Sequence, residues 1–231
     1  MLLPAPIIEQ HAGIVVVRDD LLPGGTKMRA ILPLMQAQAA GEFVYASPAQ
    51  GYAQVAMAHC ARLLGRRATV FTAARQQPHM LTVAAAQAGA NIITVPCGYL
   101  SVVQARARAY AAERGAFLVP FGADDAASMQ AISAAATATG LQPQEVWSVA
   151  GSGVLTRALQ RAWPQARFVA VVVGKQGCDT GLARRIVHPL PFERQAKVLP
   201  PFPSAPCYDA KAWEYIRAEA MPGALFWNVG A

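Results

Sequence analysis

Short apolar runs that alternate with alanine-rich stretches of helical length constrain this sequence more than any other feature. The runs at 13–18, 68–72 and 168–173 are nearly continuous in apolar residues, which is typical of strands buried on both faces. The stretches between the runs, such as 52–64 and 100–114, are long enough for helices, and glycine follows each of these two. This alternation predicts parallel βαβ units, and we therefore expect an α/β fold.

The expected elements cover most of the chain. After about residue 175 the sequence becomes irregular and rich in proline, up to 206, and after 220 we expect only a short tail. We predict strands at 13–18, 43–46, 68–72, 91–95, 117–120, 145–149 and 168–173, and helices at 27–40, 52–64, 79–88, 100–114, 126–139, 154–163 and 210–220.

Composition excludes several classes of protein. Of the 231 residues, 54% are hydrophobic and 14% charged, whereas disordered chains are poor in apolar residues and rich in charge. No stretch reaches the roughly 18–20 uninterrupted apolar residues of a membrane helix, and the first residues do not read as a signal peptide. We expect a cytoplasmic protein with reduced thiols and no metal site, because no CxxC pair occurs among Cys60, Cys97, Cys178 and Cys207.

The segment 23–29 (PGGTKMR) places Lys27 after a Gly-Gly turn, at the start of an expected helix. The positive end of the helix macrodipole and the neighbouring Arg29 both favour loss of a proton from this lysine. A neutral amine is the form that makes a Schiff base with a carbonyl compound. Taken alone, such a segment is more often an ordinary turn that carries a surface lysine.

Two further loops stand between an expected strand and an expected helix. The segment 47–52 (SPAQGY) has small and polar residues where open α/β sheets bind ligands, and it also fits an ordinary loop with a helix cap. The segment 151–156 (GSGVLT) offers backbone N–H groups, a helix dipole and two hydroxyls to a phosphate. It lacks the lysine of a Walker A loop and the last glycine of G-x-G-x-x-G, so alone it is a weak indication.

In this order, the three segments resemble the pyridoxal-phosphate (PLP) enzymes of fold type II, the tryptophan synthase β-like superfamily. The sequence is most similar to the D-cysteine desulfhydrase and aminocyclopropane-carboxylate deaminase families, whose lysine segment reads Gly-Gly-Asn-Lys-x-Arg. The segment 206–212 (PCYDAKA) resembles their late Asp-Pro-Val-Tyr-(Thr/Glu)-Gly-Lys-Ala stretch. The resemblance implies two open, twisted, mostly parallel sheets flanked by helices. A smaller domain at 41–118 would be inserted in a larger PLP-binding domain made of 1–40 and 119–231.

The resemblance also implies roles for individual residues. Lys27 would hold pyridoxal 5′-phosphate as a Schiff base and then carry the α-proton of the substrate. Asp209 would face the pyridine nitrogen and keep it protonated, although it also stands where a helix cap is expected. Ser47 and the acid Tyr208 would lie on the substrate side, and Gln50 replaces the usual Asn against the 3′-oxygen. The phosphate would lie on Gly151, Ser152, Gly153 and Thr156.

Positive charge is concentrated in the expected inserted domain. The chain has 20 Lys and Arg against 13 Asp and Glu, a formal net charge of +7. Residues 41–118 hold seven arginines and two acidic residues, so +5 of this charge falls in about a third of the chain. One-sided basic footprints are typical of nucleic-acid binders, and a solvated arginine-rich surface explains the charge equally well. The candidate nucleic-acid contacts are Arg66, Arg67, Arg106 and Arg108.

The resemblance and the charge lead to a functional hypothesis. Members of these families are usually about a third longer, so we expect shortened loops and an open site that admits a bulky substrate. Some bacteriophage-encoded relatives act on amino acids attached to modified thymine, in DNA-hypermodification pathways. We expect an isomerase or lyase that forms an α-carbanion (quinonoid) on an amino-acid group, such as glycyl, carried on DNA. In a phage-encoded protein, the compartment would be the host cytoplasm.

Two alternatives remain open from the sequence. The first is a lyase, deaminase or desulfhydrase that acts on a free small amino acid. The second is a non-catalytic relative that binds another phosphate ligand. In each case the resemblance implies a homodimer as the usual assembly.

Overall fold

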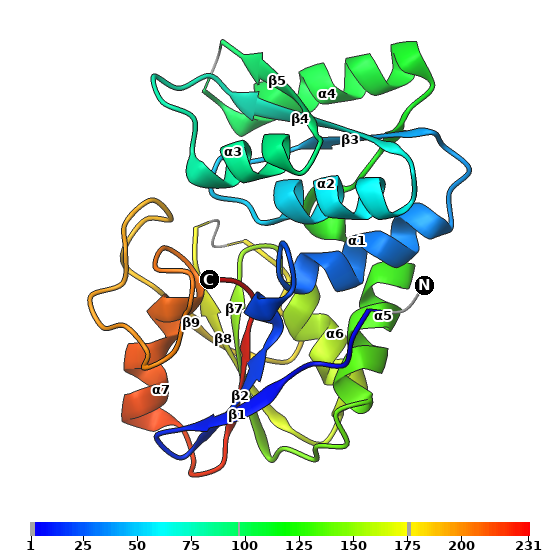
Figure 1. Ribbon diagram of the computed structural model, residues 1–231. Helices are drawn as coiled ribbons and strands as arrows, with labels where there is room; N and C mark the ends of the chain where they lie inside the picture. Colours follow the sequence, from blue (N-terminus) through cyan, green and yellow to red (C-terminus); the bar gives the residue numbers. More distant parts are fainter. Residues whose placement is uncertain (1–2, 97, 175–176) are drawn as a thin grey trace.

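The computed structural model describes residues 3–96, 98–174 and 177–231, so Cys97 lies outside the described residues. Figure 1 shows two lobes, each built on one sheet, with α1 (Thr26–Gln36) where they meet. Both sheets are mostly parallel and flanked by helices, which confirms the α/β fold predicted from the alternation. Among the described residues, no helix is both long enough and apolar enough to cross a membrane.

The larger sheet has the strand order β1-β2-β10-β7-β8-β9, and only the pair β1–β2 is antiparallel among its described pairings. One face packs against α1, α5 (Ala126–Thr137) and α6 (Val154–Ala162), and α7 (Trp213–Glu219) covers the other face (Figure 1). The strands are β1 (Ile8–His11), β2 (Ile14–Arg18), β7 (Glu145–Ala150), β8 (Arg167–Val172), β9 (Arg184–Val187) and β10 (Leu225–Asn228).

The last strand corrects the prediction of a short tail after residue 220. Strand β10 lies inside the larger sheet, paired in parallel with β2 on one side and β7 on the other. Its four residues, LFWN, are all buried, and Trp227 is fully so. Four residues are too few to show a periodic pattern, so the partners of this strand, far earlier in the chain, determine its structure. The short edge strands β1 and β9 were not predicted either, because they too are too short to show a periodic pattern.

The smaller sheet is entirely parallel, with the order β5-β4-β3-β6. All its strands come from residues 42–118, within the range proposed for the inserted domain. Helices α2 (Ala53–Leu63) and α3 (Met80–Gln87) cover one face, and α4 (Leu100–Arg114) covers the other. The strands are β3 (Glu42–Ala46), β4 (Arg67–Ala73), β5 (Asn91–Val95) and β6 (Phe117–Leu118).

The loops singled out in the sequence all follow carboxyl ends of strands. The lysine turn follows β2 and a short 3₁₀ helix, the segment 47–52 follows β3, and the segment 151–153 follows β7. In parallel sheets, ligands bind at these ends, in the crevice between loops from different strands. The fold therefore directs the loops of both sheets toward the space between the lobes.

Candidate active site between the two lobes

A cavity of about 480 Å³ is lined by both lobes. The larger lobe contributes Lys27 of α1, the loop 151–153 and Tyr208, and the smaller lobe contributes Tyr45 and Gln50. A concave, mostly apolar space of this size with a few convergent polar groups is typical of a small-molecule site.

Lys27 lies in the first turn of α1, and its Nζ donates a hydrogen bond of 2.6 Å to the carbonyl of Gly122. Burial lowers the pKa of this amine from 10.5 to about 8, and the nearby Asp124 opposes the shift. Arg29, expected to favour the neutral amine by its charge, is instead paired with Asp19 at 2.7 Å. Burial is therefore the main cause of the lowered pKa.

Two glycines allow the chain to approach Lys27 closely. Gly25 precedes α1 with φ +66°, and a Cβ there would lie 1.9 Å from the carbonyl oxygen of Val229. Gly122 has φ +74°, and a Cβ there would lie 2.6 Å from Ser152. Both positions require glycine for conformation and for space. They hold Lys27 between the end of β10 and the loop after β7.

The loop 151–153 supplies an anion site at the start of α6. Gly153 is the N-cap of α6 with φ +82°, and no side chain caps the helix among the described residues. The first backbone N–H groups of a helix lack intrahelical partners, and together with the helix dipole they favour an anion. A Cβ at Gly153 would lie 1.7 Å from the carbonyl oxygen of Asp179, so this turn also requires glycine.

Asp209 is a completely buried carboxyl group that does not itself line the cavity but directly follows the lining residue Tyr208. Its Oδ2 accepts a hydrogen bond of 3.0 Å from the backbone N–H of Gly230, which follows the cavity-lining Val229. Its Oδ1 has no partner among the described residues, and it caps neither of the short helices that follow. Burial raises the pKa of this carboxyl well above its usual value. An orphaned oxygen of this kind suits a donor that enters from the cavity.

Comparisons with known proteins bear on the fold. No protein-family model and no curated protein matches the sequence. Among solved structures, an ACC deaminase homologue matches with a TM-score of 0.79 at 14% identity, over 94% of this chain and 84% of that one. The chain has the fold of the fold-type-II pyridoxal-phosphate enzymes.

Two further fold-type-II structures match at lower TM-scores. Diaminopropionate ammonia lyase from Escherichia coli matches with a TM-score of 0.67 at 16% identity, over 94% of this chain and 77% of that one. A pyridoxal 5′-phosphate-dependent aspartate racemase matches with a TM-score of 0.61 at 14% identity, over 74% of this chain and 57% of that one. At these identities the likeness establishes the fold alone.

The other candidate site residues divide into those that line the cavity and those that lie behind it. Gly151, Ser152, Gln50 and Tyr208 line it. The Tyr208 hydroxyl donates to the carbonyl of Val149 at 3.2 Å, and burial raises the pKa of this phenol, so it is protonated at neutral pH.

Two hydroxyls that the resemblance assigned to the site do not line the cavity. The Oγ of Ser47 is buried and donates to the carbonyl of Pro48 at 2.9 Å. The hydroxyl of Thr156 is fully buried and lies 2.9 Å from the Oγ of Ser148, within hydrogen-bond distance. In this structure each hydroxyl holds its own loop in place.

Several cavity residues were not anticipated from the sequence. They belong to strand, helix and turn positions whose direction depends on how the lobes meet, so no local pattern marks them. Tyr52, inside the segment 47–52, donates from its hydroxyl to the carbonyl of Ala231 at 2.9 Å. The unanticipated lining residues with polar or aromatic side chains are Thr26, Tyr45, Tyr52, Ser101, Gln104, Phe121 and Phe192.

The candidate nucleic-acid arginines occupy two separate places. Arg66 donates to the carbonyls of Met35 and Gln38, and Arg67 pairs with Glu42 at 3.1 Å. Both stand at the amino end of β4, whereas the cavity lies at the carboxyl ends of the strands.

The other two arginines, Arg106 and Arg108, are exposed on α4. Arg108 lines a second cavity of about 200 Å³. Arg106 lines neither this cavity nor the first one.

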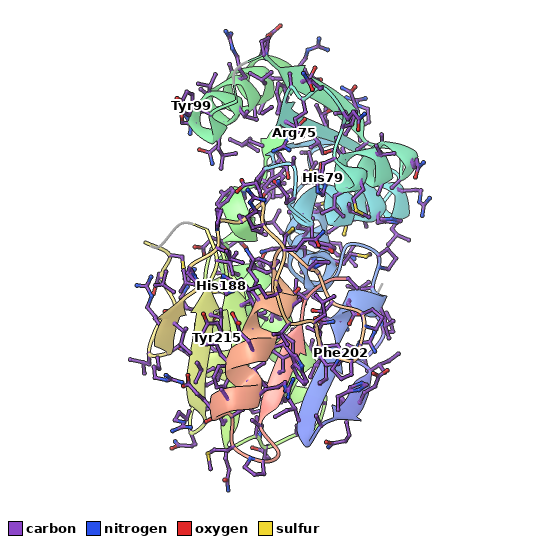
Figure 2. All side chains as sticks on the ribbon, turned by 90° about the vertical axis from the view of Figure 1, so that its left-hand side faces the viewer. Arg75, His79, Tyr99, His188, Phe202 and Tyr215 are labelled. Carbon is purple, nitrogen blue, oxygen red and sulfur yellow. The ribbon has the colours of Figure 1, made fainter. Side chains whose placement is uncertain are left out.

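The histidines lie in different parts of the molecule. Figure 2 shows His79 in the lobe of the smaller sheet and His188 in the lobe of the larger one. His188 is buried and within hydrogen-bond distance of Glu214, at 3.1 Å. Within the described ranges, no group of three or more His, Cys, Asp or Glu side chains could hold a metal ion.

Proposed function

We propose that this chain is a PLP-dependent enzyme that acts at the α-carbon of an amino-acid group. The observation that carries the proposal is the amine of Lys27, whose pKa burial lowers to about 8 and which lines the cavity between the lobes. Formation of a Schiff base requires a neutral amine, and an amine with this pKa loses its proton near neutral pH.

The residues around the cavity fit pyridoxal 5′-phosphate. The uncapped start of α6, with Gly151, Ser152 and Gly153, would hold the phosphate. Lys27 would bind the aldehyde carbon, and the unpaired Oδ1 of Asp209 would accept from the protonated ring nitrogen. The cavity volume lies within the range of roughly 300–1,000 Å³ that is typical of ligand sites.

The chemistry at the substrate follows from these side chains. Bound PLP would supply an electron sink for negative charge at the α-carbon. Lys27 would take the proton from that carbon and return it, since a pKa near 8 suits exchange in both directions at neutral pH. Tyr208 would offer a neutral hydroxyl to the substrate from the wall of the larger lobe, because burial keeps this phenol protonated.

The proposal is tested by the covalent attachment of PLP to Lys27. The purified protein should take up PLP with a visible absorption band, and borohydride followed by peptide mass spectrometry should find the modification on Lys27. Lys211 is the internal control, because burial lowers its pKa as well, but it donates to the carbonyl of Pro191 and does not line the cavity. A colourless protein would support a non-catalytic relative, and modification at Lys211 would contradict the assignment.

For the substrate, we propose an amino-acid group carried on DNA, acted on by an isomerase or lyase. The support is the +5 charge within residues 41–118 and the position of Arg108 beside the site. Arg66 supports it less, because its guanidinium is engaged with the end of α1. Salt-sensitive binding of duplex DNA is the expected result, and no binding at low salt would contradict it.

The second candidate is a lyase or deaminase of a free small amino acid. The structural likeness to an ammonia lyase and an ACC deaminase homologue favours it. Its expected result is a keto acid from at least one member of a broad amino-acid panel. A panel without keto acid, together with salt-sensitive DNA binding, would decide for the DNA-carried group.

A further inference from the structure

A second cavity lies next to the first, along α4. It has a volume of about 200 Å³ and shares Tyr45, Gln104 and Phe121 with the first cavity. Shared lining residues make the two spaces neighbours on the same wall. The remaining lining residues of the second cavity are Ala46, Arg108, Leu118, Val119 and Pro120.

One face of α4 runs through both spaces. Ser101 and Gln104 line the first cavity, and Gln104 and Arg108 line the second. Residues three and seven positions apart share a helix face. At 1.5 Å per residue, Ser101 and Arg108 are about 10 Å apart along the helix axis. A ligand that reaches from the Ser101 end of the first cavity to Arg108 therefore extends well beyond a free small amino acid.

The charge at the far end of this path is uncompensated. Arg108 is exposed and makes no hydrogen bond or ion pair with the described part of the chain. Three other arginines of the same lobe are engaged: Arg62 with His59, Arg67 with Glu42, and Arg114 over the ring of Tyr110. No acidic residue lines the second cavity, so an anion there meets no repulsion from its walls.

Two aromatic side chains, Tyr45 and Phe121, line both spaces. Phe121 is 44% exposed although it is a large hydrophobic residue, and it lines both cavities with Tyr45. These aromatic surfaces suit the apolar or planar middle of a ligand. The side-chain amide of Gln104 adds a hydrogen-bond donor near Arg108.

We infer that the second cavity is a subsite for an anionic group of the substrate, a carboxylate or phosphate oxyanion bound by Arg108. The inference rests on the proposed function, because it places the reacting amino-acid group at Lys27. The charged group of the substrate then lies roughly 10 Å along α4 from the Ser101 end of the first cavity, the length of about three extended residues. A guanidinium binds both kinds of oxyanion in the same bidentate geometry.

Calorimetric titration of the PLP-loaded protein tests the subsite with two matched pairs of probes. Triglycine and triglycinamide differ in a carboxylate, and thymidine monophosphate and thymidine differ in a phosphate. Each pair is titrated into the wild type, Arg108→Gln and Arg106→Gln. Arg106 is the matched control, because it lies two positions away on the same helix, exposed, and turned about 200° from Arg108.

The expected result is that the charged member of a pair binds more tightly than the neutral one. Arg108→Gln should weaken that binding by about tenfold, and Arg106→Gln should leave it unchanged. An effect with triglycine alone identifies a carboxylate, and an effect with thymidine monophosphate alone identifies a nucleotide phosphate. Equal loss in both variants, equal binding of charged and neutral probes, or no binding of any probe overturns the subsite.

Failure of the subsite differs from failure of the proposed function. Borohydride labelling of Lys27 does not depend on Arg108. A labelled protein without Arg108-dependent binding keeps the PLP assignment and loses the subsite. A protein that takes up no PLP loses the proposed function, and the inference with it.

Discussion

The amine of Lys27 donates a hydrogen bond of 2.6 Å to the carbonyl of Gly122, although 95 residues separate them in the chain. The N–H of the same glycine donates to the hydroxyl of Tyr45 on β3 at 3.3 Å. Gly122 therefore connects the lysine on α1 with the smaller sheet. The surroundings of the amine, and with them its pKa, depend on how the two lobes meet.

Uptake of PLP by the cofactor-free protein should accelerate with rising pH and level off above about 8. Burial lowers the pKa of Lys27 from 10.5 to about 8, so the neutral, nucleophilic amine predominates above that lower value. The initial rate at which the visible band appears, measured from neutral to alkaline pH, gives the midpoint. An N-acetyl-lysine amide solution is the control for an unshifted amine. A protein midpoint equal to that of the free amine would contradict the burial of Lys27.

Asp209→Asn should stabilise the cofactor-free protein at neutral pH. Burial raises the pKa of Asp209, so the native state holds its proton more tightly than the unfolded chain, and this stability is lost as pH rises through the native pKa. Asparagine still accepts from Gly230 but carries no charge. We expect a gain of about 1–2 kcal/mol in denaturant unfolding at neutral pH, and no gain at acidic pH.

The same substitution at a paired aspartate provides the control for Asp209. Asp19 is equally buried, but it pairs with Arg29 and accepts from the indole of Trp227. Asp19→Asn should cost about 3–5 kcal/mol, because it leaves the guanidinium unpaired. Opposite signs at the two sites are the expected outcome. A loss at both would mean that Asp209 is already compensated without a cofactor.

The part of the fold that could be predicted is the part with local patterns. Strands such as β5 and β8 are apolar runs followed by turns, so their own residues identify them. Strand β10 carries too few residues for this, yet it occupies the middle of the larger sheet because β2 and β7 leave a place for Trp227 and its neighbours. Long-range pairing of this kind leaves no mark in the sequence.

The candidate site could be predicted where glycine marks a backbone requirement. Gly25 and Gly153 have positive φ angles and lie in contact with other segments, and both belong to loops that the sequence marks as candidate sites. Side-chain direction could not be predicted. The hydroxyls of Ser47 and Thr156 have suitable chemistry but turn to Pro48 and Ser148, while Tyr45 enters the cavity from a strand that reads as ordinary core.

Gly153→Ala should lower both stability and affinity for PLP. A Cβ at this position would lie 1.7 Å from the carbonyl oxygen of Asp179, and φ is +82°. We expect a loss of roughly 2–4 kcal/mol in the free energy of unfolding, from overpacking added to backbone strain. Displacement of the loop also moves the N–H groups that would bind the phosphate, so PLP should bind more weakly in spectroscopic titration.

Gly140→Ala is the control that separates the cost of backbone strain from the cost of overpacking in Gly153→Ala. Gly140 has φ +71°, but a Cβ there would meet nothing within 4 Å. Its substitution should cost about 1 kcal/mol for the left-handed conformation alone and leave PLP affinity unchanged. Equal losses for the two variants would show that the contact with Asp179 relaxes without cost.

Arg66→Ala should destabilise the protein by about 1–2 kcal/mol, whereas Arg67→Ala should cost less than about 0.5 kcal/mol. Arg66 donates to the carbonyls of Met35 and Gln38 at the end of α1 and lies over the ring of Phe43. Arg67 is 78% exposed and pairs with Glu42 at the surface. Denaturant unfolding of both variants measures the difference.

The same two variants separate a structural arginine from a nucleic-acid contact. If Arg66 has a structural role at the end of α1, Arg66→Ala lowers the free energy of unfolding. Its effect on DNA affinity is then no larger than that of Arg67→Ala, which removes one neighbouring charge. If both arginines contact phosphates, each substitution weakens DNA binding by a similar factor and reduces its salt dependence, while stability stays close to that of the wild type. The hydrogen bonds of Arg66 favour the first result.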